Sequence, residues 1–303
     1  MTIEQYTFGN GLKWLALHSN TLKGSEQTPE TFDIDKEIVS YALDKNERAH
    51  TEYDWENETF TLIYNVLNPD QAEYHYETVP MTFVVKENQL ITIYNDDNAY
   101  IVAKMKHYLA HHPDMTCYKF LFATLFMISE SYFPYLEEID QTKDDINRRL
   151  RLKTTKKDLL ALSDIETGMV YLVSAANQNT ILLEQIKGQN LYKQLSESDK
   201  EQLEDAIIEA KQLSSMTQLN AQVLQQLSGA YNNILNNNLN DNMTTLTIMS
   251  ILLAVLAVIT GFFGMNVPLP IADRPDAWLL IAGGGIILWI VLLSLLRYLI
   301  SRK

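Results

Sequence analysis

The chain has 303 residues, 24 Lys and Arg against 38 Asp and Glu, and a formal net charge of −14 at pH 7. Hydrophobic residues make up 47% of it and charged residues 20%, which excludes an intrinsically disordered chain because such chains have too few apolar groups to bury. The excess of acids argues against a nucleic-acid partner, since phosphate contacts need clustered Lys and Arg, and the single cysteine, Cys117, excludes an internal disulfide or a cysteine-based zinc site.

Residues 1–114 are predicted to form a mixed α/β domain. Runs rich in β-branched and aromatic residues, which favour strands, occur at Phe60–Tyr64, Met81–Val85 and Leu90–Tyr94. Lys86–Gln89 joins the last two runs as a predicted hairpin turn, and Thr31–Leu43 is a predicted helix. We expect a small sheet with helices packed on it.

From Met115 onward the pattern becomes helical. Residues 115–197 are predicted to form antiparallel helices, the longest over Tyr132–Leu152 and from about Lys156 to Lys187, where Gly188 follows. Another helix begins near Ser196, whose neighbours supply capping side chains. Because no proline follows until position 268, the simplest prediction is one continuous helix from about residue 198 through an apolar segment, roughly 100 Å long. Such a helix is not stable alone in water and needs partners.

The stalk, residues 198–242, has an unusual composition in its second half. Residues 212–242 contain one charge, Asp241, and many Gln and Asn. Apolar residues recur there with coiled-coil-like spacing at Met216, Val223, Leu227 and Ile234. This seam packs either on its own domain or in an oligomeric bundle, and the Asn and Gln on the other faces favour a hydrated oligomeric funnel.

Two uncharged apolar segments, residues 243–263 and 277–296, each have the length of a membrane-spanning helix. The alternative is a pair of buried helices in a soluble protein, but soluble helices rarely exclude charge over this length. We therefore predict a membrane protein with two C-terminal transmembrane helices. They are joined by a short link, residues 264–276.

The flanking charges predict the orientation. The tail, residues 297–303, holds Arg297, Arg302 and Lys303, whereas in the link Arg274 is offset by two acids. The positive-inside rule places this tail in the cytoplasm, and two spans return the chain to the same side. We expect a multi-pass protein of the cell membrane with both termini cytoplasmic, and the N-terminus has no signal-peptide pattern.

A two-span subunit cannot enclose a pore alone, so any transport requires a ring of subunits. Small or polar residues recur at helical spacing along and just before the first span: Asn240, Met243, Thr247, Ser250, Ala254, Ala257 and Gly261. This face either lines a pore or packs against another helix, since small residues also let helices approach closely. Neither span contains Asp, Glu, Lys or Arg, which excludes a charged intramembrane ion site.

The end of the first span resembles a known family. Gly264-Met265-Asn266 follows Phe262-Phe263 and is similar to the Gly-Met-Asn signature of the CorA-type divalent metal-ion (magnesium) transporters. In that family the signature closes the pore helix at the outer mouth, before a short loop and a second span. Tyr231 and the Asn-rich run to Asn240 also resemble the family's stalk where it enters the membrane.

The resemblance implies a fold and a function. The expected fold is a cytoplasmic α/β domain with a long helical stalk that continues into two transmembrane helices, assembled as a homopentameric funnel. The expected function is transport of divalent cations, Mg²⁺ first, with no cofactor other than the transported ion and no enzymatic activity. A neutral ring of Gly264, Met265 and Asn266 would bind the hydrated ion, because Mg²⁺ loses its water reluctantly.

Further site residues follow from the same resemblance. Asp273 and Asp276 in the link would concentrate cations outside. Inside, Asn240 would form a second polar ring, and Met243 and Leu246 an apolar constriction that gates by dewetting.

The sequence also departs from the family pattern. A regulatory metal site between subunits would use Asp205 of the stalk, but its N-terminal counterpart is Tyr41, and Asp44 lies one turn away. Regulation by Mg²⁺ is therefore less strongly predicted than transport. Two alternatives stay open: the zinc-, Co²⁺- or Ni²⁺-transporting branch of the superfamily, and a membrane-anchored sensor or scaffold without transport.

Other polar patterns have simpler interpretations. His111-His112-Pro113-Asp114 is predicted to be a polar loop, since adjacent histidines point in different directions. The acids of the 132–152 helix are predicted to lie on a solvated face: Glu137, Glu138, Asp140, Asp144 and Asp145. Gly283-Gly284-Gly285 lies mid-span and predicts close helix packing.

Overall fold

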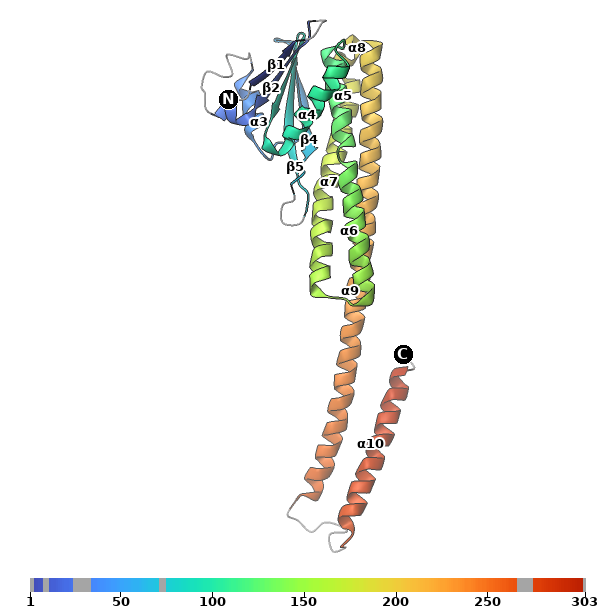
Figure 1. Ribbon diagram of the computed structural model, residues 1–303. Coiled ribbons are helices and arrows are strands. Elements are labelled where there is room, and N and C mark those ends of the chain that lie inside the picture. The colour runs from blue at the N-terminus through green and yellow to red at the C-terminus, as the bar shows by residue number, and fades with distance from the viewer. Residues whose placement is uncertain (1–2, 8–10, 24–33, 71–74, 266–274, 302–303) are drawn as a thin grey trace. The chain divides into compact units, whose positions relative to one another are not determined.

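The computed structural model describes residues 3–7, 11–23, 34–70, 75–265 and 275–301. The chain divides into two compact units, residues 1–229 and 230–303. Helix α9 (Glu197–Phe263) is continuous across the boundary at residue 229. The first unit contains a sheet and long helices, and the second contains the rest of α9 and helix α10 (Ala277–Ser301) (Figure 1).

The first unit contains a sheet with the strand order β1-β2-β6-β5-β4-β3. Its strands are β1 (Ile3–Thr7), β2 (Lys13–His18), β3 (His50–Asp54), β4 (Thr59–Leu67), β5 (Thr78–Lys86) and β6 (Gln89–Tyr94). All neighbouring pairs are antiparallel except β2 and β6, which are parallel. Parallel strands need a long crossover, and here the crossover contains α1 (Ser19–Lys23), α3 (Lys36–Leu43) and three strands.

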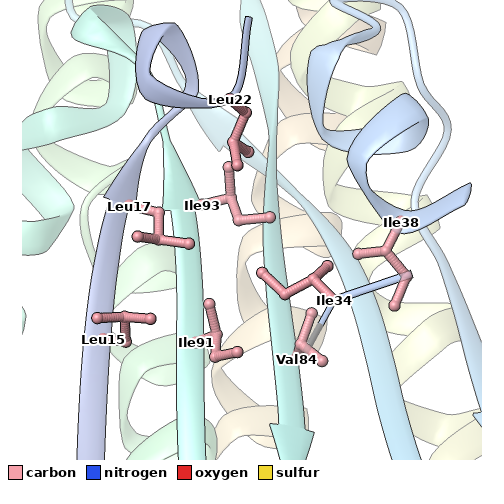
Figure 2. Close-up of a cluster of buried hydrophobic side chains, with 8 residues drawn as sticks. All are labelled: Leu15, Leu17, Leu22, Ile34, Ile38, Val84, Ile91 and Ile93. Atoms are coloured by element: carbon pink, nitrogen blue, oxygen red, sulfur yellow. The ribbon is translucent and has the colours of Figure 1, made fainter. Parts of the chain in front are cut away.

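Helices cover both faces of this sheet. On one face, Leu15 and Leu17 of β2 and Ile93 of β6 lie in an apolar cluster with Leu22 of α1 and Ile38 of α3 (Figure 2). Successive strand residues point to opposite faces, and Trp14, which precedes Leu15 in β2, packs edge-on against Phe120 of α5 at 5.3 Å between ring centroids. Strand β4 is buried at every position, as expected for a strand covered on both sides.

Long helices complete the first unit. They are α4 (Ala99–His111), α5 (Cys117–Glu130), α6 (Phe133–Leu152), α7 (Lys156–Gly188) and the short α8 (Asn190–Gln194), preceded by the 3₁₀ turn η1 (Asp96–Asn98). Helix α7 runs antiparallel to the first part of α9, because Lys187 pairs with Glu204 and Lys211 with Glu184. The Thr180 hydroxyl also donates to the Ala210 carbonyl at 3.0 Å.

A buried amide joins the sheet to these helices. Asn65 of β4 lies opposite Pro80 of β5, which has no N–H to donate, and on its other side β3 ends at His50, opposite Ile63. The side chain of Asn179 takes the place of the missing strand: its Oδ1 accepts from the Asn65 N–H at 3.0 Å and its Nδ2 donates to the Asn65 carbonyl at 2.8 Å. The Tyr132 hydroxyl donates to the same carbonyl at 2.9 Å. These bonds satisfy backbone groups that would otherwise be buried without partners.

Most elements predicted from the sequence are confirmed. The three predicted strands lie inside β4, β5 and β6, and the helices predicted from residues 132, 156 and 198 are α6, α7 and α9. The predicted start of the helix at Thr31 is wrong, because Ile34 and Asp35 are not helical and α3 begins at Lys36. Residues 31–33 lie outside the described part. Helix α4, whose buried Ile101, Met105 and Leu109 follow a helical period, was not predicted.

The Asn179 amide gives a stability prediction. Asn179→Ala leaves the buried N–H of Asn65 without its acceptor, and we expect the free energy of unfolding to fall by about 1–3 kcal/mol. Asn177→Ala, two residues away on the exposed side of α7, is the matched control and should change it by less than about 0.5 kcal/mol. Denaturant unfolding of the two variants measures both values, and equal losses would contradict the role of Asn179.

Candidate functional site

The apolar part of α9 packs against α10 along one face. Among the residues from 244 to 263, Leu252 is only 1% exposed, and Ile248, Val255 and Ile259 around it are half-buried. A Cβ atom on Gly285 of α10 would lie 4.0 Å from the Ile259 side chain, so this face of α9 contacts α10. Figure 1 shows the two helices side by side in the second unit.

The small and polar residues predicted from the sequence lie on the opposite face of α9. With about 100° between successive helical residues, they centre on the side that faces away from Leu252. All of them are exposed in the single chain: Asn240, Met243, Leu246, Thr247, Ser250, Ala254, Ala257 and Gly261. The face is continuous, uncharged and, within the chain, uncovered.

The hydroxyl groups on this face are oriented by the helix itself. The Thr247 Oγ1 donates to the Met243 carbonyl at 2.8 Å, and the Ser250 Oγ donates to the Leu246 carbonyl at 2.9 Å. Because each hydroxyl hydrogen is used inside the helix, the oxygen presents lone pairs outward. The face therefore offers hydrogen-bond acceptors, which suit the outward-pointing hydrogens of a cation's water shell.

The signature at the end of α9 is described only in part. The Gly264 N–H donates to the Thr260 carbonyl at 2.9 Å, and a Cβ on Gly264 would lie 3.0 Å from that oxygen, so a side chain there would crowd the last turn. Met265 is exposed. Asn266 and Asp273 lie outside the described residues, and Asp276 is exposed with its carbonyl accepting from the Leu279 N–H at 3.1 Å.

Three helices in the described part are long and apolar enough to cross a membrane: α7, α9 and α10. In α7, 39% of the most apolar stretch is buried inside the chain, against 6% in α9 and none in α10. Helix α7 contributes the buried Asn179 and Thr180 to hydrogen bonds within the first unit, so its apolar side chains belong to a soluble core. The membrane segments are those of α9 and α10, as predicted.

The two candidate regulatory acids lie on separate surfaces. Asp44 ends α3 and lines a pocket of about 150 Å³ at the carboxyl ends of β2 and β6, together with His18, Asp96 and Asp97. The His18 Nε2 donates a hydrogen bond to the Asp96 carboxylate at 3.1 Å, since its Nδ1 accepts from the Asn20 N–H. Asp205 is exposed on α9, and among the described contacts none joins it to Asp44.

Tyr41 has an acidic environment that the sequence analysis missed. Its hydroxyl donates to the Glu37 carboxylate at 2.6 Å. This hydrogen bond, with smaller contributions from burial and from the charges of Glu37, Glu52 and Glu47, raises the pKa of Tyr41 to about 12. Tyr41 is therefore protonated at neutral pH and is a poor cation ligand. The signal in the sequence is Glu37 at i−4, one helical turn before Tyr41.

The remaining polar patterns provide no metal centre. Among the described residues, no group of three or more His, Cys, Asp or Glu is placed to hold a metal ion. The acids of α6 are exposed apart from the half-buried Asp140, which pairs with Lys143, so the predicted solvated face is confirmed.

Two further expectations are corrected. His111 is the last residue of α4 rather than part of a loop, and only His112 to Asp114 lie outside the helix. None of the three mid-span glycines packs closely within the described chain: a Cβ on Gly285 would lie 4.0 Å from Ile259, and one on Gly283 or Gly284 would meet nothing within 4 Å.

Comparison with known proteins gives consistent matches over nearly the whole chain. Residues 9–298 match the family described as "CorA-like Mg2+ transporter protein". A curated relative, the cobalt/magnesium transport protein CorA of Methanocaldococcus jannaschii, is 25% identical over 286 residues, which cover 90% of this chain and 87% of the relative.

Solved structures agree with this match in fold. The complete structure of the CorA magnesium transporter from Methanocaldococcus jannaschii superposes with a TM-score of 0.77 at 21% identity, covering 99% of this chain and 93% of that one. The full-length CmaX protein gives a TM-score of 0.71 at 16% identity and covers 94% and 88%.

Proposed function

This chain belongs to the family of CorA-like Mg²⁺ transporter proteins, and on that premise we propose that it passes hydrated divalent cations, Mg²⁺ first, through a pore lined by α9 of several subunits. The observation that carries the proposal is the uncovered, uncharged face of α9 opposite α10. The family assignment itself confirms the expected resemblance, and it places the chain among membrane transporters rather than enzymes or scaffolds. The expected fold of α/β domain, long stalk and apolar C-terminal helices is confirmed by the full-length structural match.

The pore must form between subunits. Two helices cannot surround an aqueous path, and the packing of α10 on the Leu252 face leaves the Ser250 face for neighbouring copies. The apolar seam of the stalk supports the same arrangement, since Met216, Val223 and Ile234 are all more than a third exposed in the single chain. Each of these side chains is partly covered within the chain and keeps surface that a neighbouring copy could cover, and Leu227 of the same seam is half-buried. By the family resemblance the ring is a homopentamer with its N- and C-terminal parts in the cytoplasm.

The cation is recognised through its water. Mg²⁺ keeps its hydration shell, so the pore must bind the outer hydrogens of that shell and not the metal. Asn266 side-chain carbonyls and backbone carbonyls near Gly264 form a neutral acceptor ring at the outer mouth, and Thr247 and Ser250 continue it as acceptors deeper in the span. Because the rings are neutral, the ion binds without being trapped.

The charge distribution assists entry at both ends. Asp273 and Asp276 raise the local cation concentration outside. Residues 243–303 carry four cations and two acids, so the first 242 residues hold a net charge of −16, repeated in every subunit. A negative cytoplasmic potential adds about 2.3 kcal/mol per elementary charge per 100 mV, which favours inward flow. Asn240, Met243 and Leu246 form the inner polar ring and the apolar constriction.

Removing the Asn266 amide tests the outer ring. We expect Asn266→Ala to lower Mg²⁺ uptake into proteoliposomes by about tenfold or more, because one lost hydrogen bond per subunit weakens binding by about 1 kcal/mol each. Asn177→Ala, an exposed asparagine on α7, is the matched control and should retain wild-type flux.

Equal uptake by wild type and Asn266→Ala would remove Asn266 from the selectivity ring. The same vesicles with Co²⁺, Ni²⁺ or Zn²⁺ as competitors rank the ions, and a strong preference for Zn²⁺ over Mg²⁺ would move the chain to the zinc-transporting branch.

Cysteine accessibility tests the pore-lining face. We expect Ser250→Cys and Ala254→Cys to react quickly with a charged, water-soluble thiol reagent, because they face water in the assembled pore. Leu252→Cys on the α10 side and Ile251→Cys, exposed in the single chain but off the polar face, should react at least about tenfold more slowly because the ionised thiolate is the reactive form and lipid disfavours it. The native Cys117 is 2% exposed and adds little background. Similar rates at all four positions would exclude a pore on this face.

The Tyr41 environment gives a gating prediction. Because Tyr41 is a protonated phenol where the family resemblance implies an acid, we expect flux to change by less than about threefold between zero and millimolar cytoplasmic Mg²⁺. Patch recordings or vesicle flux with Mg²⁺ set on the cytoplasmic side measure this dependence. Strong closure would contradict it, and closure that survives Asp44→Asn with Asp205→Asn would place the sensor elsewhere, with Glu37, Glu47 and Glu52 the first residues to test.

A further inference from the structure

The connection between α6 and α7 has a charge opposite to that of the soluble part around it. Residues 148–157 contain six of the 24 Lys and Arg of the chain and no acid, although the first 242 residues carry a net charge of −16. The last acid of α6 is Asp145 and the next acid along the chain is Asp158 of α7, so the positive charge is confined to the tip of this helical hairpin. This positive charge does not help to bind the transported ion, because a basic surface repels divalent cations.

The hairpin tip is both basic and apolar on its surface. Arg151, Lys153, Lys156 and Lys157 are exposed, and within the described residues none of them lies within 4 Å of a carboxylate oxygen. Leu152 stands between them with 89% of its surface exposed. An apolar residue this exposed inside a basic cluster is typical of segments that lie against a membrane surface.

The backbone of the tip is held in place. Arg149 of α6 donates to Asp158 of α7 at 2.8 Å, and Thr155 caps α7 by accepting from the Asp158 N–H at 3.2 Å. Hydrogen bonds from Thr155 first and Arg149 second lower the pKa of Asp158, so this carboxylate is ionised at neutral pH. The four exposed cations and Leu152 are thus presented from a fixed turn.

The tip lies at the end of the first unit from which α9 leaves it. Helix α7 is antiparallel to the first part of α9, with Lys187 near the start of α9 at Glu204 and Thr180 at Ala210. The beginning of α7 therefore lies at the end of the bundle from which α9 leaves the first unit at Gly229 and continues toward its apolar segment (Figure 1). Along α9, residues 230–242 connect this end of the first unit to the apolar segment that begins at Met243.

We propose that residues 148–157 form a docking surface for anionic lipid headgroups of the surrounding bilayer, with Arg151, Lys153, Lys156 and Lys157 binding phosphates and Leu152 entering the interface. The occupant follows from charge complementarity and from the membrane location of the chain. Clusters of four to eight Lys and Arg beside a membrane segment bind acidic lipids, and each cation changes the contact equilibrium by about fivefold. The contact would couple lipid charge to the position of the hairpin beside the stalk.

The experiment uses the full chain in lipid nanodiscs. A bimane label on Thr154→Cys reports approach to the bilayer through quenching by spin-labelled lipid, with Cys117 buried and unlabelled. We expect quenching to be at least about threefold stronger in discs with 30% phosphatidylglycerol than in pure phosphatidylcholine. It should fall to the phosphatidylcholine level near 1 M salt, where the Debye length is about 3 Å.

Two charge variants distinguish the tip from the rest of the surface. Replacing Arg151, Lys153, Lys156 and Lys157 with Gln should abolish the dependence on phosphatidylglycerol. The control variant Lys36→Gln/Lys104→Gln/Lys193→Gln, at exposed lysines on other helices, should keep it. Leu152→Ser should reduce quenching by deep spin labels more than by headgroup labels.

Quenching of the bimane-labelled Thr154→Cys chain tests the proposal by itself, without the charge variants. Quenching that is equal in both lipid compositions and unaffected by salt would overturn the proposal. That result is also the one expected if the tip contacts acids of a neighbouring subunit, because such a contact does not depend on lipid charge. Proteoliposome Mg²⁺ uptake is measured in parallel, so failure of transport and failure of lipid docking are separate results.

Discussion

The bilayer core contains no water, and the absence of water limits which backbone structures can cross the membrane and how an ion path can be enclosed. Every backbone polar group in the membrane has to find a partner within a helix, and two helices satisfy their own groups without enclosing a path for an ion. In this chain, the two faces of the apolar part of α9 differ in composition. One face packs its bulky residues around Leu252 against α10, and the other presents small, neutral groups and hydroxyl acceptors, which additional subunits cover in the proposed pore.

The division of charge follows from the same constraint. No ionised group is carried inside the spans, where a charge would be costly and would hold a divalent cation too tightly. The acidity is placed in the first 242 residues instead, where water screens it and it still attracts cations. The basic hairpin tip and the basic C-terminal tail are the exceptions, and in the proposed orientation both lie on the cytoplasmic side.

Patterns among neighbouring residues predicted the helices whose formation depends on those neighbours. The long uncharged runs predicted both membrane helices, and the uninterrupted helical pattern from residue 198 predicted α9. The parallel pairing of β2 with β6 and the amide of Asn179 against Asn65 were not predicted, because they join residues more than 70 and 110 positions apart. The acidic surroundings of Tyr41 are only partly local: Glu37 lies one helical turn before it, whereas Glu52 approaches it from β3 only once the chain has folded. The proposed pore-lining residues share one face of α9 because helical spacing alone puts them there, whereas their proposed role depends on other copies of the chain, which a single sequence does not describe.

In the proposed pore, the exposed faces of α9 from several subunits meet in a closed ring. Native mass spectrometry of the full chain released from lipid nanodiscs gives the number of subunits. We expect one dominant species of five copies, about five times the 34.8 kDa of the chain. A monomer or dimer as the dominant species, in a preparation that transports Mg²⁺, would contradict it.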